Sequence, residues 1–139
     1  METTERFFFP KRERLYLKND IDNLFENGKS FISYPLRIVY LSDFTDNSSK
    51  SGISVFVSVP KKRFKYASKR NRIKRLIRES FRLNKNALTN LYKLNDKHLY
   101  IAFLYVCNEV LPYSDIEKAT LKALKKIRTN NSPAENIIE

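Results

Sequence analysis

The chain has 139 residues, of which 42% are hydrophobic and 13% aromatic, which suits one compact domain and excludes a globally disordered chain. No apolar run approaches the roughly 18 residues that cross a bilayer, and one cysteine, Cys107, excludes an internal disulfide and a zinc site of clustered thiolates. The net charge of +12 is concentrated in residues 61–85, which hold twelve Lys or Arg against one acid, whereas the rest holds fifteen against fourteen. This concentration predicts a polyanionic partner.

The N-terminal part predicts an irregular stretch followed by one short helix. Residues 1–16 contain Pro10 and mixed charges, without a signal-peptide pattern, so we expect a cytoplasmic protein. Asn19 is a suitable N-cap, and Gly28 is a typical helix stop. The helix between them would bury a stripe that consists of Ile21, Leu24 and Phe25.

Two strands are predicted next, over 36–41 and 53–59, joined by a polar loop. In the first strand Arg37, Val39 and Leu41 face one way, and the alternate residues face the other. In the second strand we place Phe56 in the core.

A basic connector over 61–66 leads to a helix that we expect to run to about Leu88. The apolar run 99–106 predicts a central strand, with Cys107 a small buried thiol at its end. A helix after Pro112 would begin with a capping box of Ser114 and Glu117. Its buried stripe would comprise Ile116, Thr120, Ala123, Leu124 and Ile127.

The order α-β-β-α-β-α therefore predicts an α+β fold, a two-layer sandwich in which helices pack on one sheet. We expect a single domain over residues 1–128 and a flexible tail over 129–139.

The basic helix has two chemically different sides. An apolar stripe around Ile73 comprises Leu76, Ile77, Phe81 and Leu83, and the opposite arc is cationic. Arg75 and Glu79 are spaced for an i, i+4 ion pair. A solvated helix would intersperse more acids, and a membrane-surface helix would lack strands to cover its apolar side. Because Arg outnumbers Lys here, nucleic acid is the favoured partner.

The order of residues in this element resembles a known family. The run RNRIKRLIRE over 70–79, followed by Phe81 and Arg82, is similar to the signature helix of the protein subunit of bacterial ribonuclease P. The upstream SVPKK over 58–62 and the opening from Arg14 through Phe25 to Gly28 resemble the same family. The resemblance covers about residues 12–128.

The resemblance implies a mixed four-stranded sheet with helices and a left-handed βαβ crossover through the basic helix, although the general rule favours a right-handed one. A fourth strand would lie near residues 31–34. It also implies that the RNA subunit is the catalyst, with Mg²⁺ bound by that RNA, and that the protein supplies no catalytic residue and binds no cofactor of its own.

The family's two binding surfaces carry over as expectations, with ribonuclease P RNA and precursor tRNA as partners and neither a membrane nor a small-molecule substrate. The residues expected to bind the RNA subunit are Lys69, Arg70, Asn71, Arg72, Lys74, Arg75, Arg78 and Arg82. Those expected to hold the 5′ leader of precursor tRNA, in a cleft between the N-terminal helix and the sheet, are Ile21, Phe25, Arg37, Val39, Lys61, Lys62, Arg63 and Lys65.

Several positions keep ordinary alternatives. Phe25 is by composition a core residue more often than a stacking platform. Ile21 stands where an aromatic is common in the family, which leaves only apolar contact there. Val39 stands where some relatives carry an aromatic, and whether Tyr34 or Tyr40 substitutes for it depends on strand register. Arg37 could be an ordinary exposed strand residue.

Two other functions compete with this interpretation. A stand-alone nuclease would need convergent carboxylates or histidines, but the acids are scattered and we expect the only histidine, His98, at the surface. A general RNA-binding or ribosome-associated module would share the basic helix without any role in tRNA processing.

Overall fold

The computed structural model describes residues 18–44, 52–94 and 97–130. Four strands form one mixed sheet in the order β1-β2-β4-β3. The described elements follow the chain as α2 (Lys18–Asn27), β1 (Lys29–Ser33), β2 (Leu36–Phe44), β3 (Gly52–Ser58), α3 (Ala67–Asn84), α4 (Asn86–Leu94), β4 (Lys97–Tyr105) and α5 (Tyr113–Asn130). The α+β sheet-and-helix architecture is therefore as predicted, with β1 and α4 added to the expected order.

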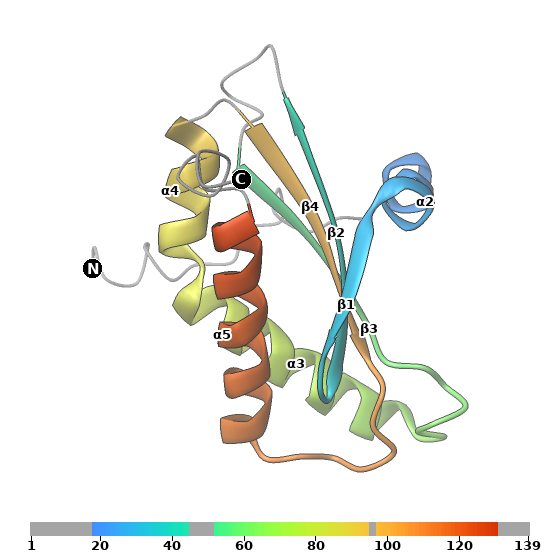
Figure 1. Ribbon diagram of the computed structural model, residues 1–139. Helices are drawn as coiled ribbons and strands as arrows, with labels where there is room; N and C mark the ends of the chain where they lie inside the picture. The colour runs from blue at the N-terminus through green and yellow to red at the C-terminus, as the bar shows by residue number, and fades with distance from the viewer. Residues whose placement is uncertain (1–17, 45–51, 95–96, 131–139) are drawn as a thin grey trace, which may run out of the picture.

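The sheet has helices on both faces, in very different amounts. Figure 1 shows α3, α4 and α5 on one face of the sheet and α2 alone on the other. In the ranges that the structure describes, no helix is long and apolar enough to cross a membrane. Residues 1–17 and 131–139 lie outside those ranges, so the expectations for both ends of the chain stay predictions.

The strand pairing explains how a helical segment comes to join neighbouring strands. β1 and β2 are antiparallel, as are β2 and β4, whereas β3 and β4 pair in parallel. Parallel neighbours need a crossover connection, which α3 and α4 provide. The left hand of this crossover stays a prediction from the family resemblance.

The main core lies between the sheet and α3, α4 and α5. Ile73, Ile77 and Phe81 of α3 are completely buried there. The ring of Phe81 packs against Phe103 of β4 with ring centroids 5.9 Å apart. The predicted α5 stripe is buried as expected, and Thr120 shares a 2.8 Å hydrogen bond with Ser80 of α3.

Three local expectations were wrong. The basic helix ends at Asn84 instead of Leu88, and a separate helix, α4, begins at Asn86. Leu83, expected in the apolar stripe, is 37% exposed because it lies at the margin of that stripe. α5 already begins at Tyr113, so Ser114 lies inside it, and Glu117 accepts a hydrogen bond from the Tyr113 hydroxyl instead of closing a capping box.

Gly28 sets how α2 joins the sheet. Its N–H donates to the Leu24 carbonyl at 2.8 Å, which closes the helix as predicted. A Cβ at this position would clash with that carbonyl and would lie 2.9 Å from the Tyr40 carbonyl of β2. Because only glycine permits this approach, α2 can turn directly into β1 and lie against the sheet.

Candidate nucleic-acid interface

The outer side of α3 is the most concentrated cationic surface of the described chain. Ile73, Ile77 and Phe81 turn inward, which leaves the opposite side of the helix to solvent. Four of the eight residues predicted to bind the RNA subunit are exposed and four are half-buried. The exposed ones are Lys69, Asn71, Arg72 and Arg75, and the half-buried ones are Arg70, Lys74, Arg78 and Arg82.

Two arginines fix the connector that precedes α3. Arg70 donates from Nη1 to the carbonyls of Phe64 and Lys65, at 2.8 and 3.1 Å. Arg63 donates to Oδ1 of Asn108, in the β4–α5 loop, at 2.7 Å. Both guanidinium groups therefore shape the connector, and their remaining N–H groups stay available to an acceptor.

The only acid of the basic element pairs differently from the prediction. Glu79 forms a 2.6 Å ion pair with Arg82, three residues along the helix, and not with Arg75. Arg82 is thus partly neutralised, whereas Arg75 is exposed and retains its charge.

The second surface, here called the α2 face, is the sheet face on which α2 lies. Leu24 of α2 is completely buried against Val39 of β2 and Ala102 of β4. The register places Arg37 opposite Leu104, and Leu104 opposite Ser58 at the end of β3. This row of side chains therefore leads across the sheet from Arg37 to the start of the connector, where Lys61 and Lys62 are exposed.

Phe25 stands at the side of α2 that faces β3. Its side chain is 44% exposed, and its ring packs perpendicular to that of Phe56, with the centroids 6.2 Å apart. Phe56, which we expected in the core, is half-buried on the same face. Ile21 packs partly buried beside them. The α2 face therefore carries the exposed aromatic ring of Phe25, and the cations that follow β3 border this face.

The register also settles the positions of the tyrosines. Tyr40 is 5% exposed and packs in the main core, so it does not lie on the α2 face. Tyr34 lies in the turn between β1 and β2, where the Tyr34–Pro35 peptide is cis and the tyrosine is 64% exposed. Val39 is on the predicted face but only 4% exposed, because α2 covers it.

Two residues of the α2 face were not identified from the sequence. Tyr100 and Leu104 of β4 pack partly buried on it. The β4 run is apolar on both faces, so its composition conceals which side chains share a face with Arg37. Alternation along the strand is the signal that could have separated them from Leu99 and Phe103.

The groups considered for other chemistry are structural. Cys107 is a buried free thiol, as predicted. His98, the second residue of β4, is half-buried and so keeps part of the surface exposure we expected, and its Nε2 lies 2.7 Å from the Ser54 hydroxyl. Within the described ranges, no three His, Cys, Asp or Glu residues gather closely enough to hold a metal ion.

Comparisons with known proteins identify the family of this chain. The family model for ribonuclease P matches residues 9–128. A ribonuclease P protein component from Porphyromonas gingivalis is 42% identical over 130 residues, covering 94% of this chain and 93% of the relative. One from Chlorobium phaeobacteroides is 36% identical over 102 residues, covering 69% and 70% of the two chains.

The fold matches as well. The ribonuclease P protein of Thermotoga maritima superposes with a TM-score of 0.62 at 22% identity, covering 82% of this chain and 96% of that one. That of Staphylococcus aureus gives a TM-score of 0.60, also at 22% identity, over 83% and 94% of the chains. Since the family model spans most of the sequence and a close relative aligns nearly end to end, this chain belongs to the ribonuclease P protein family.

Proposed function

We propose that this chain binds the catalytic RNA of ribonuclease P through the outer side of α3 and the 5′ leader of precursor tRNA along the α2 face. Ribonuclease P is an endoribonuclease, and the family to which this chain belongs forms its protein component. The observation that carries the proposal is the separation of two surfaces: a dense cationic helix side, and an aromatic sheet face bordered by cations.

The α3 surface suits folded RNA. Arg72 and Arg75 are exposed and three residues apart, so their guanidinium forks lie on neighbouring positions of one helix side. Such forks bind phosphate bidentately, and RNA helices are recognised largely through their shape and backbone. Arg70 contributes by holding the connector against the start of the helix.

The α2 face suits a single RNA strand, because one side of the face is acidic and the other is cationic. α2 itself carries Asp20, Asp22 and Glu26, which repel phosphates. Arg37 and the connector lysines lie toward the other side of the face and attract them. The strand would therefore turn its bases toward Phe25 and its backbone toward the cations, and stacking on one aromatic is worth ~1–3 kcal/mol per base.

The chemistry belongs to the RNA in this proposal. As the family resemblance implies, Mg²⁺ would act at sites of the RNA subunit. The chain would therefore position RNA without supplying an acid, base or nucleophile. We place this activity in the cytoplasm, where the precursor tRNA substrate would be met.

Reconstitution tests the assignment. Purified protein added to the catalytic RNA at low Mg²⁺ should restore removal of the leader from precursor tRNA. Indiscriminate RNA binding without restored cleavage would instead identify a general RNA-binding module.

Two sets of variants test the division of labour. Replacing Arg72 and Arg75 by Gln should weaken binding to the catalytic RNA and reduce its log–log salt slope by roughly 0.7–0.9 per lost phosphate contact. The matched control replaces Lys125 and Arg128, two exposed cations of α5. Equal losses in both pairs would reduce the α3 effect to overall charge.

Phe25→Ala should leave binding to the catalytic RNA intact and weaken binding of precursor tRNA relative to mature tRNA, by roughly 5- to 150-fold if one base stacks on the ring. Leu121→Ala is the matched control, because both side chains are 44% exposed. Equal effects of the Phe25 and arginine changes on both RNAs would refute the two-surface arrangement.

A further inference from the structure

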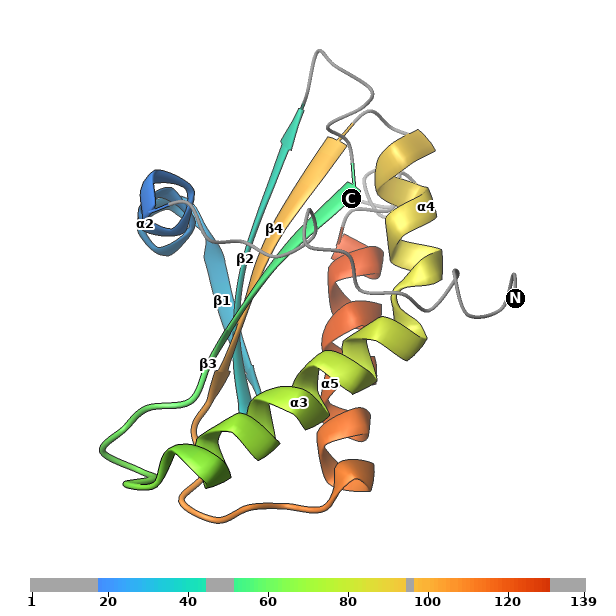
Figure 2. The same cartoon turned by 180° about the vertical axis from the view of Figure 1, so that it is seen from behind.

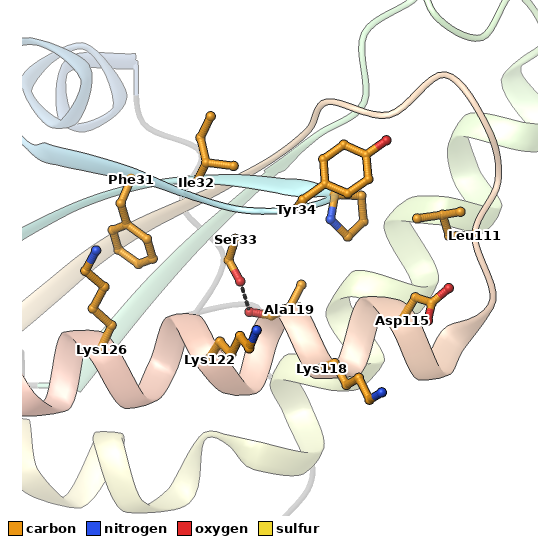
Figure 3. Close-up of a pocket in the computed structure, with 11 residues that line it drawn as sticks. Phe31, Ile32, Ser33, Tyr34, Leu111, Asp115, Lys118, Ala119, Lys122 and Lys126 are labelled. Carbon is orange, nitrogen blue, oxygen red and sulfur yellow. Dashed lines mark hydrogen bonds between the residues drawn. The ribbon is translucent and has the colours of Figure 1, made fainter.

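A cavity of about 660 Å³ lies between β1 and α5, on the side of the sheet opposite the α2 face. We call it the α5 groove; its cationic wall consists of Lys118, Lys122 and Lys126, and its apolar wall includes Phe31, Tyr34 and Leu111. Figure 3 shows these side chains, with the Ser33 hydroxyl bonded to the Ala119 carbonyl at 2.8 Å between the two walls. Neither binding surface proposed above includes any of these residues.

The lysine wall is a regular row on one side of α5. The three lysines are four residues apart, so neighbouring members are separated by about 6 Å along the helix axis. All three are exposed. Lys126 reaches across the groove to Phe31, with Nζ 4.5 Å from the ring centroid (Figure 3). The only acid that lines the groove is Asp115, so the groove has a net positive charge and favours an anionic ligand.

Lys118 and Lys122 remain available to such a ligand. Neither forms an ion pair with another residue in the part of the chain that the structure describes. Lys126, by contrast, is already engaged by an aromatic face. The free part of the cationic wall is therefore the half next to Tyr34 and Leu111.

The apolar wall provides a flat surface at that same end. Tyr34 is 64% exposed, although the backbone next to it is fixed, since the Pro35 carbonyl accepts a 2.9 Å hydrogen bond from the Val106 N–H. The hydrogen bond with Cys107 raises the pKa of Tyr34 above its ordinary value near 10, at which the phenol is already neutral at physiological pH. An exposed aromatic side chain on a fixed backbone, beside unpaired cations, is an arrangement that binds single-stranded nucleic acid.

We propose that the α5 groove binds an unpaired RNA segment, with phosphates on Lys118 and Lys122 and a base stacked on Tyr34. An acidic peptide matches the groove less well. A peptide gains affinity by pairing as an added strand, and the strand available here, β1, has only five residues. An alternative role for lysines beside an edge strand is to prevent that strand from pairing with other chains. That role requires neither a cavity nor an exposed ring.

The first test measures binding of a fluorescent eight-nucleotide oligouridylate to the full chain carrying Arg72→Gln and Arg75→Gln, so that α3 contributes less. Lys118→Gln with Lys122→Gln should weaken binding and reduce the log–log salt slope by roughly 1.4, that is, about 0.7 for each phosphate contact. Lys125→Gln with Arg128→Gln removes equal charge from the same helix outside the groove. Equal losses in both pairs would overturn the proposal.

The second test separates stacking from hydrogen bonding. Tyr34→Ala should weaken oligouridylate binding by roughly 5- to 150-fold, whereas Tyr34→Phe should bind like the parent. A loss of the same size with Phe would overturn the stacking arrangement. Because the side chain is largely exposed, neither change should alter the thermal midpoint of unfolding.

The third test locates the strand and identifies its chemistry. A 4-thiouridine oligonucleotide should photocrosslink to the peptide that contains Tyr34, and crosslinks confined to α2 or α3 would overturn the proposal. An oligoglutamate of equal charge should compete poorly, and competition as strong as that of unlabelled oligouridylate would assign the groove to acidic peptides instead. None of these measurements depends on restored leader cleavage, so the groove and the proposed function can fail separately.

Discussion

Three helices cover one face of the sheet, whereas on the other α2 alone packs against β2 and β4 (Figures 1 and 2). On the helix-covered face Phe81, Phe103 and Leu99 are completely buried. On the α2 face the fully covered apolar residues are Leu24, Val39 and Ala102, while Phe25, Phe56 and Leu104 keep part of their surface. The first face supplies most of the burial that stabilises the fold, and the second leaves apolar surface for a ligand to cover.

The largest predicted effect tests the helix-covered face. Phe81→Ala should lower the free energy of unfolding by about 3–5 kcal/mol, because the ring is completely buried against Phe103 and its removal leaves a cavity. Urea denaturation measures this loss. Leu83→Ala, on the exposed margin of the same helix, should cost less than about 1 kcal/mol. Similar losses for both would show that α3 contributes little to the core.

Leu24→Ala tests the α2 face with a side chain that is equally buried. We expect a loss near the lower end of the usual range, about 2 kcal/mol, since α2 rests on two strands only and can detach locally. Hydrogen exchange should therefore quicken in α2 while amides of α3 and α5 keep their protection. Equal acceleration in all three helices would mean that the two faces unfold as one unit.

The sequence predicted the sides of the helices better than their ends. Ile73, Ile77 and the α5 stripe follow the 3.6-residue period, which depends only on which side faces the sheet. The break between α3 and α4 at Lys85 was missed because the hydrophobic period of the sequence continues past Asn84 and Asn86. It depends on local and tertiary contacts: Nδ2 of Asn84 donates to the Ser80 carbonyl of its own helix at 2.7 Å and to Glu117 of α5 at 3.4 Å, and Lys85 is only 5% exposed.

The cationic part of the candidate interface could be predicted from the sequence. The parts whose positions depend on strand register were harder to predict. The exposed cations of α3 follow from the order of residues alone. The position of Tyr40 depends on strand alternation. The position of Tyr34 depends on the turn between β1 and β2, and β1 was expected from the family resemblance only. The α5 groove was not anticipated, because Lys118 and Tyr34 are 84 positions apart and meet only through the pairing of β1 with β2 and the packing of α5.

A smaller effect concerns the end of the helix-covered face. The Tyr105 hydroxyl donates to the Glu109 carbonyl at 2.6 Å and accepts from the Leu111 N–H at 3.1 Å, so Tyr105→Phe should cost about 1–2 kcal/mol. Burial raises the pKa of Tyr105 from 10.0 to about 12. The unfolded chain therefore loses this proton first, and the stability due to the neutral phenol is present below pH 10 and lost as pH rises toward 12.

Urea denaturation at several pH values between 9 and 12 shows whether the free energy of unfolding falls as the pH rises. Stability of the parent chain should fall over this interval more steeply than that of Tyr105→Phe. Parallel slopes would show that the phenol ionises equally easily in both states. Tyr113→Phe serves as a comparison, because burial raises the pKa of Tyr113 to about 12 as well, but on α5 and away from the loop.

The smallest expected change in stability occurs on the outer side of α3. Glu79→Gln removes the ion pair with Arg82, whose side chains are 42% and 29% exposed, so the free energy of unfolding should change by less than about 1 kcal/mol. RNA binding should respond in the opposite sense, since the change removes the negative charge beside Arg82, and Glu79 is the only acid of the basic element. We expect tighter binding to the catalytic RNA and a log–log salt slope steeper by up to about 0.9. An unchanged slope would mean that Arg82 makes no phosphate contact, and would confine the α3 surface to the exposed cations nearer its N-terminus.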